Sequence, residues 1–133
     1  MEGNLIDLSK YRLEKAENNL KLAKKLYDEE IYGAALNRAY YAAFDAMRAV
    51  NVFDLFDSSK HSGVIAHFNM QYVKTGIFPP ETSSIIRRAS HLREKSDYED
   101  FYVPEREETE QVIQEVDTFL KTAQGVLKER YNE

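Results

Sequence analysis

The chain has no cysteine among its 133 residues, and only five glycines and three prolines. The lack of cysteine excludes disulfides, thiolate metal sites and cysteine nucleophiles, and it fits an intracellular protein. So few glycines leave no Gly-rich loop that would cradle a phosphate. No Ser-His-Asp set and no pair of carboxylates stands out at a spacing typical of catalysis. These absences exclude the common sequence-visible catalytic sites, and we expect a cytoplasmic protein.

A long uninterrupted hydrophobic segment is also missing. The longest stretch of alanine and aromatic residues is broken by Arg38, Asp45 and Arg48, so we expect no segment that crosses a membrane. The N-terminal sequence MEGNLIDLSKYRLEK meets charged residues too early for a secretion signal, and none is expected.

Basic residues are fewer than acidic ones, so the net charge is -5 and the isoelectric point is near 5.3. Such an acidic chain is a poor general electrostatic binder of nucleic acid. The charges are uneven, however: residues 87–95 are rich in Arg, Lys and His, whereas residues 105–117 are rich in Glu and Asp. The basic segment leaves open a local anion-binding site.

What the chain does have is helical periodicity, most clearly in residues 34–50, AALNRAYYAAFDAMRAV. Small or apolar residues recur there at steps of three or four, which predicts a helix with one stripe facing a core. The stripe consists of Ala35, Ala39, Ala43, Met47 and Val50. Because most of these side chains are small, a neighbouring helix can approach closely. We expect this central helix to be the most buried one.

A second face of the same helix carries Arg38, Tyr41, Asp45 and Arg48. Neighbouring residues point about 100° apart on a helix, so Tyr40 can enter the core while Tyr41 lies toward these charges. One interpretation is an ordinary surface, in which an arginine pairs with Asp45 and the Tyr41 ring packs with its hydroxyl in solvent. The other is a ligand site or an interface, since a purely solvated face has little use for tyrosine.

The remaining patterns predict four further helices, at about residues 5–27, 60–73, 80–98 and from 104 onward. Asp57, Ser58 and Ser59 are N-cap candidates for the third helix, and Gly76 suits a left-handed turn after it. Pro104 suits the first position of the fifth helix. With no convincing strand, the prediction is an all-α, up-and-down bundle of about five antiparallel helices, and residues 1–133 are expected to form a single domain.

Two histidines, His61 and His67, lie within the predicted third helix. Their spacing is not the i, i+4 of a helical zinc pair, and no further ligand accompanies them at metal-binding spacing. We therefore interpret both as surface or structural residues. Neither a metal ion nor a cofactor is expected.

Three segments together carry a family resemblance: NRAYYAAFDAMRAV, then SSKHSGVIAHF with VKTG, then HLREKSDYEDF. In this order and at these separations they resemble the HEPN family (higher eukaryotes and prokaryotes nucleotide-binding), in particular its small stand-alone prokaryotic members. The resemblance covers nearly the whole chain. It implies an antiparallel helical bundle that dimerises through the helices carrying its polar residues. It also implies a minimal nucleotidyltransferase as partner, in a pair similar to a toxin and its antitoxin.

Many members of that family are metal-independent ribonucleases with an R-x(4-6)-H motif. In this sequence the matching arginine is Arg93, but Tyr98 stands where the histidine would be. Tyrosine has an unperturbed pKa of about 10 and is a weak base at neutral pH. The resemblance therefore leaves open whether the protein is an enzyme.

Two hypotheses follow. In the first, the protein is a homodimeric binding module whose cleft holds a nucleotide, an RNA segment or a nucleotidyltransferase partner. The candidate ligand-binding residues are Arg38, Tyr41, Asp45, Arg93, Asp97 and Tyr98. In the second, it is a metal-independent ribonuclease in which Arg93 and Tyr98 are catalytic.

The proposed site depends on Arg93 and Asp97, which lie one helical turn apart. We expect Arg93 to be partly exposed, fixed by Asp97, and free to donate to a phosphate, with Tyr98 facing the same ligand. The alternative is that these three residues tie the end of the fourth helix to its neighbours. The apolar and aromatic surplus, with nine Tyr and seven Phe, favours a face closed by a second copy.

Overall fold

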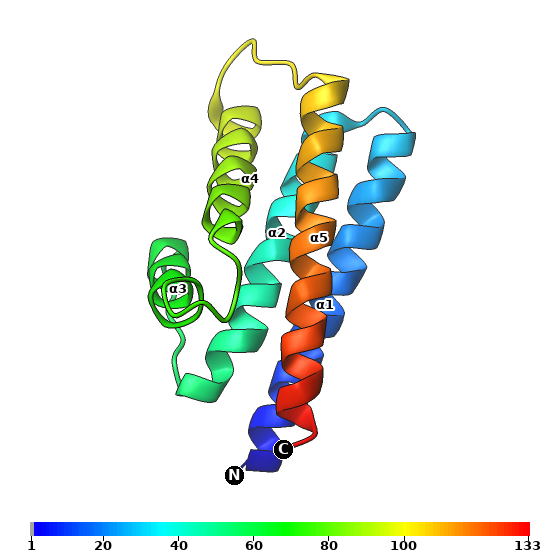
Figure 1. Cartoon of the computed structure of the whole chain (residues 1–133). Helices are drawn as coiled ribbons and strands as arrows, with labels where there is room; N and C mark the ends of the chain where they lie inside the picture. Colours follow the sequence, from blue (N-terminus) through cyan, green and yellow to red (C-terminus); the bar gives the residue numbers. More distant parts are fainter. Residues whose placement is uncertain (1) are drawn as a thin grey trace.

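The computed structural model describes residues 2–133, without the side chain of Glu2, and it is built from helices. The α-helices are α1 (Glu2–Asp28), α2 (Tyr32–Asn51), α3 (His61–Phe68), α4 (Glu81–Tyr98) and α5 (Arg106–Tyr131). A 3₁₀ turn, η1 (Val52–Asp54), follows α2, and a π-helical turn, η2 (Asn69–Val73), continues α3. The described residues contain no strand, so the predicted all-α bundle is confirmed (Figure 1).

The central helix α2 packs against all four other α-helices. Each residue of its predicted stripe is at most 2% exposed, which confirms that this stripe faces the core. Close approach at the start of α2 depends on Gly33, where an added Cβ would lie 2.9 Å from Ser96 Oγ of α4. The small residues of α2 therefore let α1, α4 and α5 surround it, as small side chains allow.

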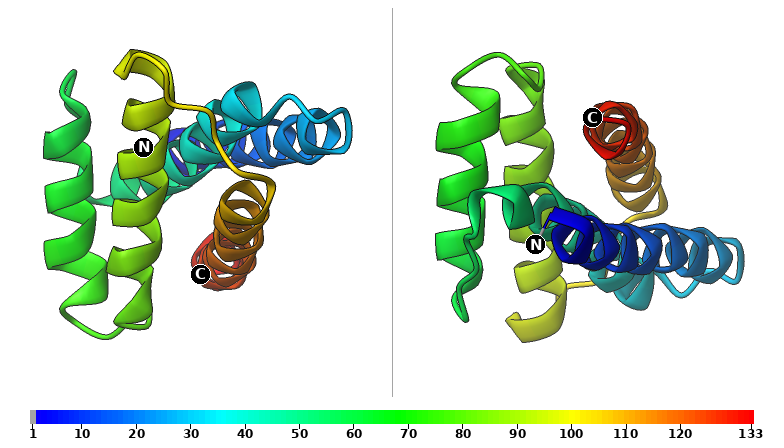
Figure 2. Two further views of the ribbon diagram at one scale, coloured as in Figure 1. Left: turned by 90° about the horizontal axis from the view of Figure 1, so that it is seen from above. Right: turned by 90° about the horizontal axis from the view of Figure 1, so that it is seen from below.

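The short helix α3 lies across the long helices. It is seen end-on in Figure 1 and along its length in Figure 2. Phe68 at its C-terminus packs against Phe78 and Phe119, with ring centroids 4.9 and 5.6 Å away. This aromatic contact fixes one end of α3 in the core.

The N-termini of α3 and α5 differ from the sequence predictions. Helix α5 begins at Arg106, and Glu105 forms a capping box with Glu108, so Pro104 precedes the helix instead of opening it. A capping box satisfies two backbone N–H groups at once, which explains why Glu105 is the N-cap and the helix does not begin at Pro104. The N-cap of α3 is Lys60, without a side-chain cap, so none of the three predicted candidates caps it.

The long helices run back and forth, so both chain termini lie at the same end of the molecule (Figure 1). Gly76 adopts the expected left-handed conformation, with φ +83, in the turn before α4. None of the helices within residues 2–133 combines enough length and enough apolar character to cross a lipid bilayer.

Candidate functional site

The guanidinium of Arg93 is buried between α4 and α2. Arg93 is only 8% exposed, so the expectation of a partly exposed arginine is wrong. Its Cζ atom lies 4.6 Å from the ring centroid of Tyr40 and 5.8 Å from that of Tyr41. The ring centroid of Tyr98, further along α4, lies 6.0 Å from the same Cζ atom. Aromatic faces attract a cation at such distances, which compensates part of the cost of burying it.

The hydrogen-bonding capacity of Arg93 is poorly used. Its Nη1 donates to Asp97 Oδ2 at 3.5 Å, the limit of a hydrogen bond. Its buried Nε has no hydrogen-bond partner among the residues that the structure describes. Burial acts to lower the pKa of Arg93, but the neighbouring phenols and Asp97 outweigh it and raise the pKa overall. Arg93 is therefore a fixed cation with donor capacity to spare.

Arg38 and Asp97 border the same cluster. The Arg38 guanidinium lies 5.2 Å from the Tyr41 ring centroid and donates to the side-chain oxygen of Asn37. Asn37 in turn donates to Asp97 at 3.2 Å. The fold thus brings Arg38, Tyr41, Arg93, Asp97 and Tyr98 together within a single chain. The contact between Asn37 and Asp97 also ties α4 to α2, as the structural alternative expected.

Asp45 and Arg48 do not form the ion pair that the surface interpretation expected. Asp45 is 5% exposed and accepts a hydrogen bond from Asn19 at 2.9 Å. Burial raises the pKa of Asp45. Arg48 instead pairs with Asp57 at 2.8 Å. Asn19 also accepts a hydrogen bond from Arg38 at 3.1 Å. Asp45 is therefore linked to the cluster through Asn19.

His61, which the sequence analysis set aside, joins this cluster from the start of α3. Its Nδ1 lies 3.0 Å from the Tyr40 hydroxyl. Its ring centroid is 4.3 Å from that of Phe44 and 5.7 Å from that of Tyr41. Burial lowers its pKa, and the charges of Arg93 and Arg48 lower it further. His61 is therefore neutral near pH 7, with one nitrogen held by a phenol.

The ring of His61 borders an open pocket of about 560 Å³. The pocket is lined by Phe44, Arg48, Asp57, Ser58, Ser59 and His61. Gly63 lies close beside it, and an added Cβ there would lie 2.7 Å from Ser58 Oγ and would force that side chain to move. The aromatic cluster thus borders, on the side of α3, a pocket lined mainly by polar side chains.

The other histidine of α3, His67, makes contacts that hold the fold together. His67 Nε2 lies 2.9 Å from Asp54 Oδ2, and its ring stacks on Phe56 at 4.0 Å. Within residues 2–133 no three His, Cys, Asp or Glu side chains are arranged to hold a metal ion. His67 accordingly links α3 to the turn after α2.

Sequence similarity places the chain among known proteins. The family model for the HEPN domain matches residues 9–126. The chain therefore belongs to the HEPN family, and the resemblance noted in its sequence is confirmed.

Individual relatives support the assignment. A protein of Methanocaldococcus jannaschii named "Putative toxin MJ0605" is 36% identical over 88% of this chain and 87% of its own length. A second protein of that organism, "Putative toxin MJ0142", is 30% identical over 86% and 78% of the two lengths. A "UPF0332 protein" of Thermotoga maritima is 32% identical over 90% of both chains. The chain is thus similar over nearly its whole length to small HEPN proteins, two of which carry the name "Putative toxin".

Sequence reasoning missed His61 because it considered His61 and His67 only as metal ligands. A signal was present: His61 lies in the segment SSKHSG, which carried part of the family resemblance. Tyr40 was expected in the core and is 1% exposed there, but its hydroxyl also holds His61. It belongs to the core and to the site at once.

Proposed function

We propose that this protein is a toxin-like HEPN module that binds a phosphate group of a nucleotide or an RNA segment at Arg93. The observation that carries the proposal is the Arg93 guanidinium fixed on the Tyr40 ring, with a hydrogen bond to Asp97 that is at the 3.5 Å limit. A guanidinium held in this way is preorganised for the planar, two-point recognition of phosphate. Tyr98 is 76% exposed and offers a ring on which a base can stack.

The proposal extends to the assembly. Two relatives carry the word toxin in their names, and the family resemblance implies a homodimer with a nucleotidyltransferase partner. Arg38 and Tyr41 face the same side as the Arg93 cluster, so a second copy would approach at the polar face of α2. Light scattering at micromolar concentration should give the mass of a dimer, and a monomeric mass would contradict this part.

Binding is tested with two probes, ATP in calorimetric titrations and a fluorescein-labelled single-stranded RNA in polarisation titrations. Arg93→Gln removes the guanidinium, and Arg88→Gln is the matched control on the same helix. Charge-assisted hydrogen bonds contribute about 1.5–3 kcal/mol, so Arg93→Gln should weaken binding of at least one probe about tenfold or more. Arg88→Gln should change it less than about twofold. Equal effects of the two variants, or no binding of either probe by the wild type, would contradict the proposal.

A second candidate function, a metal-independent ribonuclease, is favoured by a specific observation. His61 and Arg93 both contact the rings of Tyr40 and Tyr41, so a histidine lies beside the arginine although Tyr98 replaces the expected one. A neutral imidazole is a better base at neutral pH than the phenol of Tyr98. In this role Nδ1–H would donate to the Tyr40 oxygen, which leaves Nε2 as the proton acceptor.

The corresponding reaction is attack of the ribose 2′-oxygen on the adjacent phosphorus. His61 Nε2 takes the 2′-hydroxyl proton, the new bond joins phosphorus to the 2′-oxygen, and the bond to the 5′-oxygen breaks. The departing 5′-oxygen takes a proton from water, the resulting hydroxide takes the proton held by His61, and the products are a 2′,3′-cyclic phosphate and a 5′-hydroxyl. Arg93 stabilises the charge on the phosphoryl oxygens.

An RNA-cleavage assay in the presence of a chelator separates the two candidates. For a ribonuclease, His61→Gln should lower the rate by about 100-fold, the range of general acid–base catalysis, whereas Tyr98→Phe should keep most of it. The opposite order would favour Tyr98 as the catalytic residue. No cleavage by the wild type, with binding retained, leaves the binding module as the function.

A further inference from the structure

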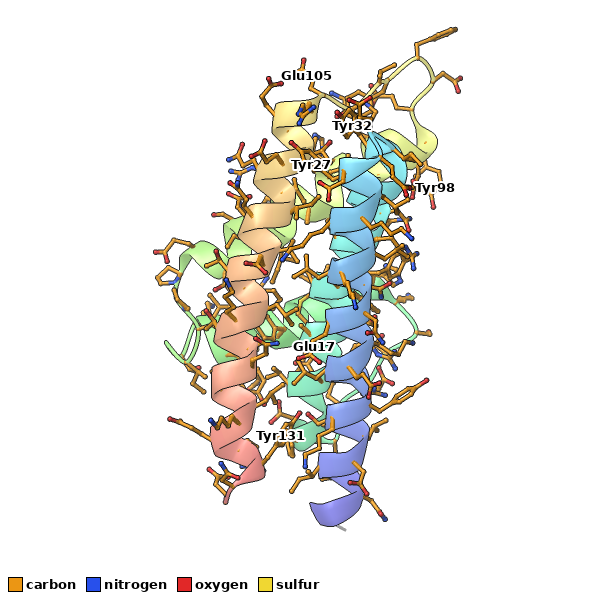
Figure 3. The ribbon with its side chains drawn as sticks, turned by 90° about the vertical axis from the view of Figure 1, so that its right-hand side faces the viewer. Glu17, Tyr27, Tyr32, Tyr98, Glu105 and Tyr131 are labelled. Atoms are coloured by element: carbon orange, nitrogen blue, oxygen red, sulfur yellow. The ribbon has the colours of Figure 1, made fainter. Side chains whose placement is uncertain are left out.

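The end of the molecule that carries the α4–α5 loop exposes an unusual number of apolar side chains. Ile31, Tyr98, Phe101 and Val103 are 48%, 76%, 103% and 77% exposed. The α1–α2 turn and the α4–α5 loop lie at this same end (Figure 1). Figure 3 shows Tyr98 there with Tyr27, Tyr32 and Glu105, far from Tyr131. We call the surface formed by residues 28–31 and 99–108 the acidic end.

Contacts between elements hold the two parts of the acidic end together. Arg106 at the start of α5 lies 3.8 Å from Glu30 in the α1–α2 turn. The same guanidinium lies 5.4 Å from the Tyr27 ring centroid. Asp97, near the end of α4, accepts a hydrogen bond from Asn37 of α2. The exposed apolar residues therefore sit on one connected surface.

Phe101 is displayed at the tip of a loop that is fixed beside it. The Tyr102 hydroxyl donates to Glu108 at 2.8 Å, and Lys95 lies 4.7 Å from the Tyr102 ring centroid. Phe101 itself adopts φ +65, a conformation that costs a non-glycine residue about 1–2 kcal/mol. The phenylalanine is thus fully exposed beside an anchored tyrosine and is available for contact with another molecule.

The charge around Phe101 is strongly negative. The acidic end contains eight carboxylates, namely Asp28, Glu29, Glu30, Glu99, Asp100, Glu105, Glu107 and Glu108. Its own Arg106 pairs with Glu30, and the neighbouring Lys95 covers Tyr102. Such a surface repels the phosphates of nucleic acid, and it also repels an identical surface on a second copy.

We propose that the acidic end docks a protein partner that receives Phe101 in an apolar pocket rimmed by lysine and arginine. The aromatic side chain supplies the buried anchor, and the carboxylates supply complementarity to the basic rim. This surface adjoins the proposed phosphate site but contains neither Arg93 nor its neighbours Asp97 and Tyr98, so the two proposals can fail independently.

The partner is sought by replacing Phe101 with a photo-crosslinking phenylalanine analogue in cells of the source organism. The same analogue at Tyr11, which is 61% exposed on α1, is the matched control. A protein crosslinked at position 101 and not at position 11 is identified by mass spectrometry, and the crosslinked peptide is mapped. Crosslinks to RNA, to a second copy of this chain, or to nothing above the control would overturn the proposal.

The identified protein is then purified and titrated against variants. Phe101→Ser should weaken binding at least tenfold, whereas Tyr11→Ser should change it less than twofold. Raising the salt concentration should weaken binding of the wild type, because rim charges are screened. Both substitutions are on exposed side chains, and equal thermal midpoints and equal ATP or RNA binding would show that fold and Arg93 site are intact. Unchanged affinity of Phe101→Ser, or a crosslinked peptide without basic residues, would contradict the proposal.

Discussion

Two arginines of α4 lie in opposite situations. Arg88 faces α5, its side chain is 40% exposed, and its Nη1 donates to both oxygens of Glu115 at 2.8 and 2.6 Å. Arg93 faces α2, its side chain is 9% exposed, and its ion pair with Asp97 spans 3.5 Å. The exposed arginine is thus well paired, whereas the buried one rests mainly on aromatic rings.

The difference separates a structural contact from a candidate binding site. An exposed ion pair contributes little because water screens it and both side chains lose freedom. A buried cation with a weak partner costs stability, so its retention suggests a use beyond folding. The aromatic cluster of α2 compensates part of the cost of that burial.

The largest effect should come from Tyr40→Ala, which removes the ring shared by Arg93 and His61. Deleting a buried aromatic side chain costs about 3 kcal/mol or more, so the thermal midpoint should fall by roughly 10 °C. Thermal unfolding followed by circular dichroism measures this, with the half-buried Tyr41→Ala as control. A smaller loss for Tyr40 than for Tyr41 would show that the ring does not hold the cluster together.

Replacing each arginine by methionine tests the comparison directly. Arg93→Met keeps a buried apolar stem, and such replacements of buried charges are often neutral, so the free energy of unfolding should change by less than about 1 kcal/mol. Binding of ATP or RNA should nevertheless fall about tenfold or more. Arg88→Met should leave binding intact. Retained binding by Arg93→Met, measured by the same titrations, would remove the distinction between the two arginines.

A double-mutant cycle on Arg88 and Glu115 measures the other side of α4. Because the pair is partly exposed, its coupling energy should be about 0.5 kcal/mol and should decrease in high salt. Urea unfolding of the wild type, Arg88→Met, Glu115→Gln and the double variant gives this value. A coupling above about 2 kcal/mol would mean that the exposed pair, too, carries much of the stability.

The smallest effect concerns pH. The pKa of His61 in the fold lies below its ordinary value of 6.5, because of burial and then the charges of Arg93 and Arg48. Below pH 6.5 the unfolded chain therefore binds more protons at His61 than the folded chain, and stability falls with falling pH. The thermal midpoint should drop more between pH 7.5 and 5.5 in the wild type than in His61→Gln. Equal drops would show that the imidazole titrates as it does in solvent.

Much of the fold could be predicted from residue spacing alone. The Ala35, Ala39 and Ala43 stripe, the left-handed Gly76 and the number of helices follow from contacts within a turn or two of helix. The start of α5 was harder, because the Glu105 capping box competes with Pro104 over two residues. The predicted start of a helix can therefore be wrong by one or two residues.

The candidate site was predicted in part. Placing Arg38, Tyr41, Arg93, Asp97 and Tyr98 in one cluster required only that α2 and α4 pack together, and they do. The sequence did not reveal that Arg48 pairs with Asp57 across a turn, since Asp45 is nearer in sequence. The catalytic or binding role of these residues stays a prediction.

The sequence by itself determined which residues form helices and which stripe of α2 is buried, because periodicity is set by neighbours along the chain. Only the tertiary structure decided the burial of Arg93 and its contact with Tyr40, since both depend on how α4 sits on α2. Tertiary packing likewise decided the place of His61. Its position follows from the transverse course of α3, which the Phe68 contacts fix and which no local pattern encodes.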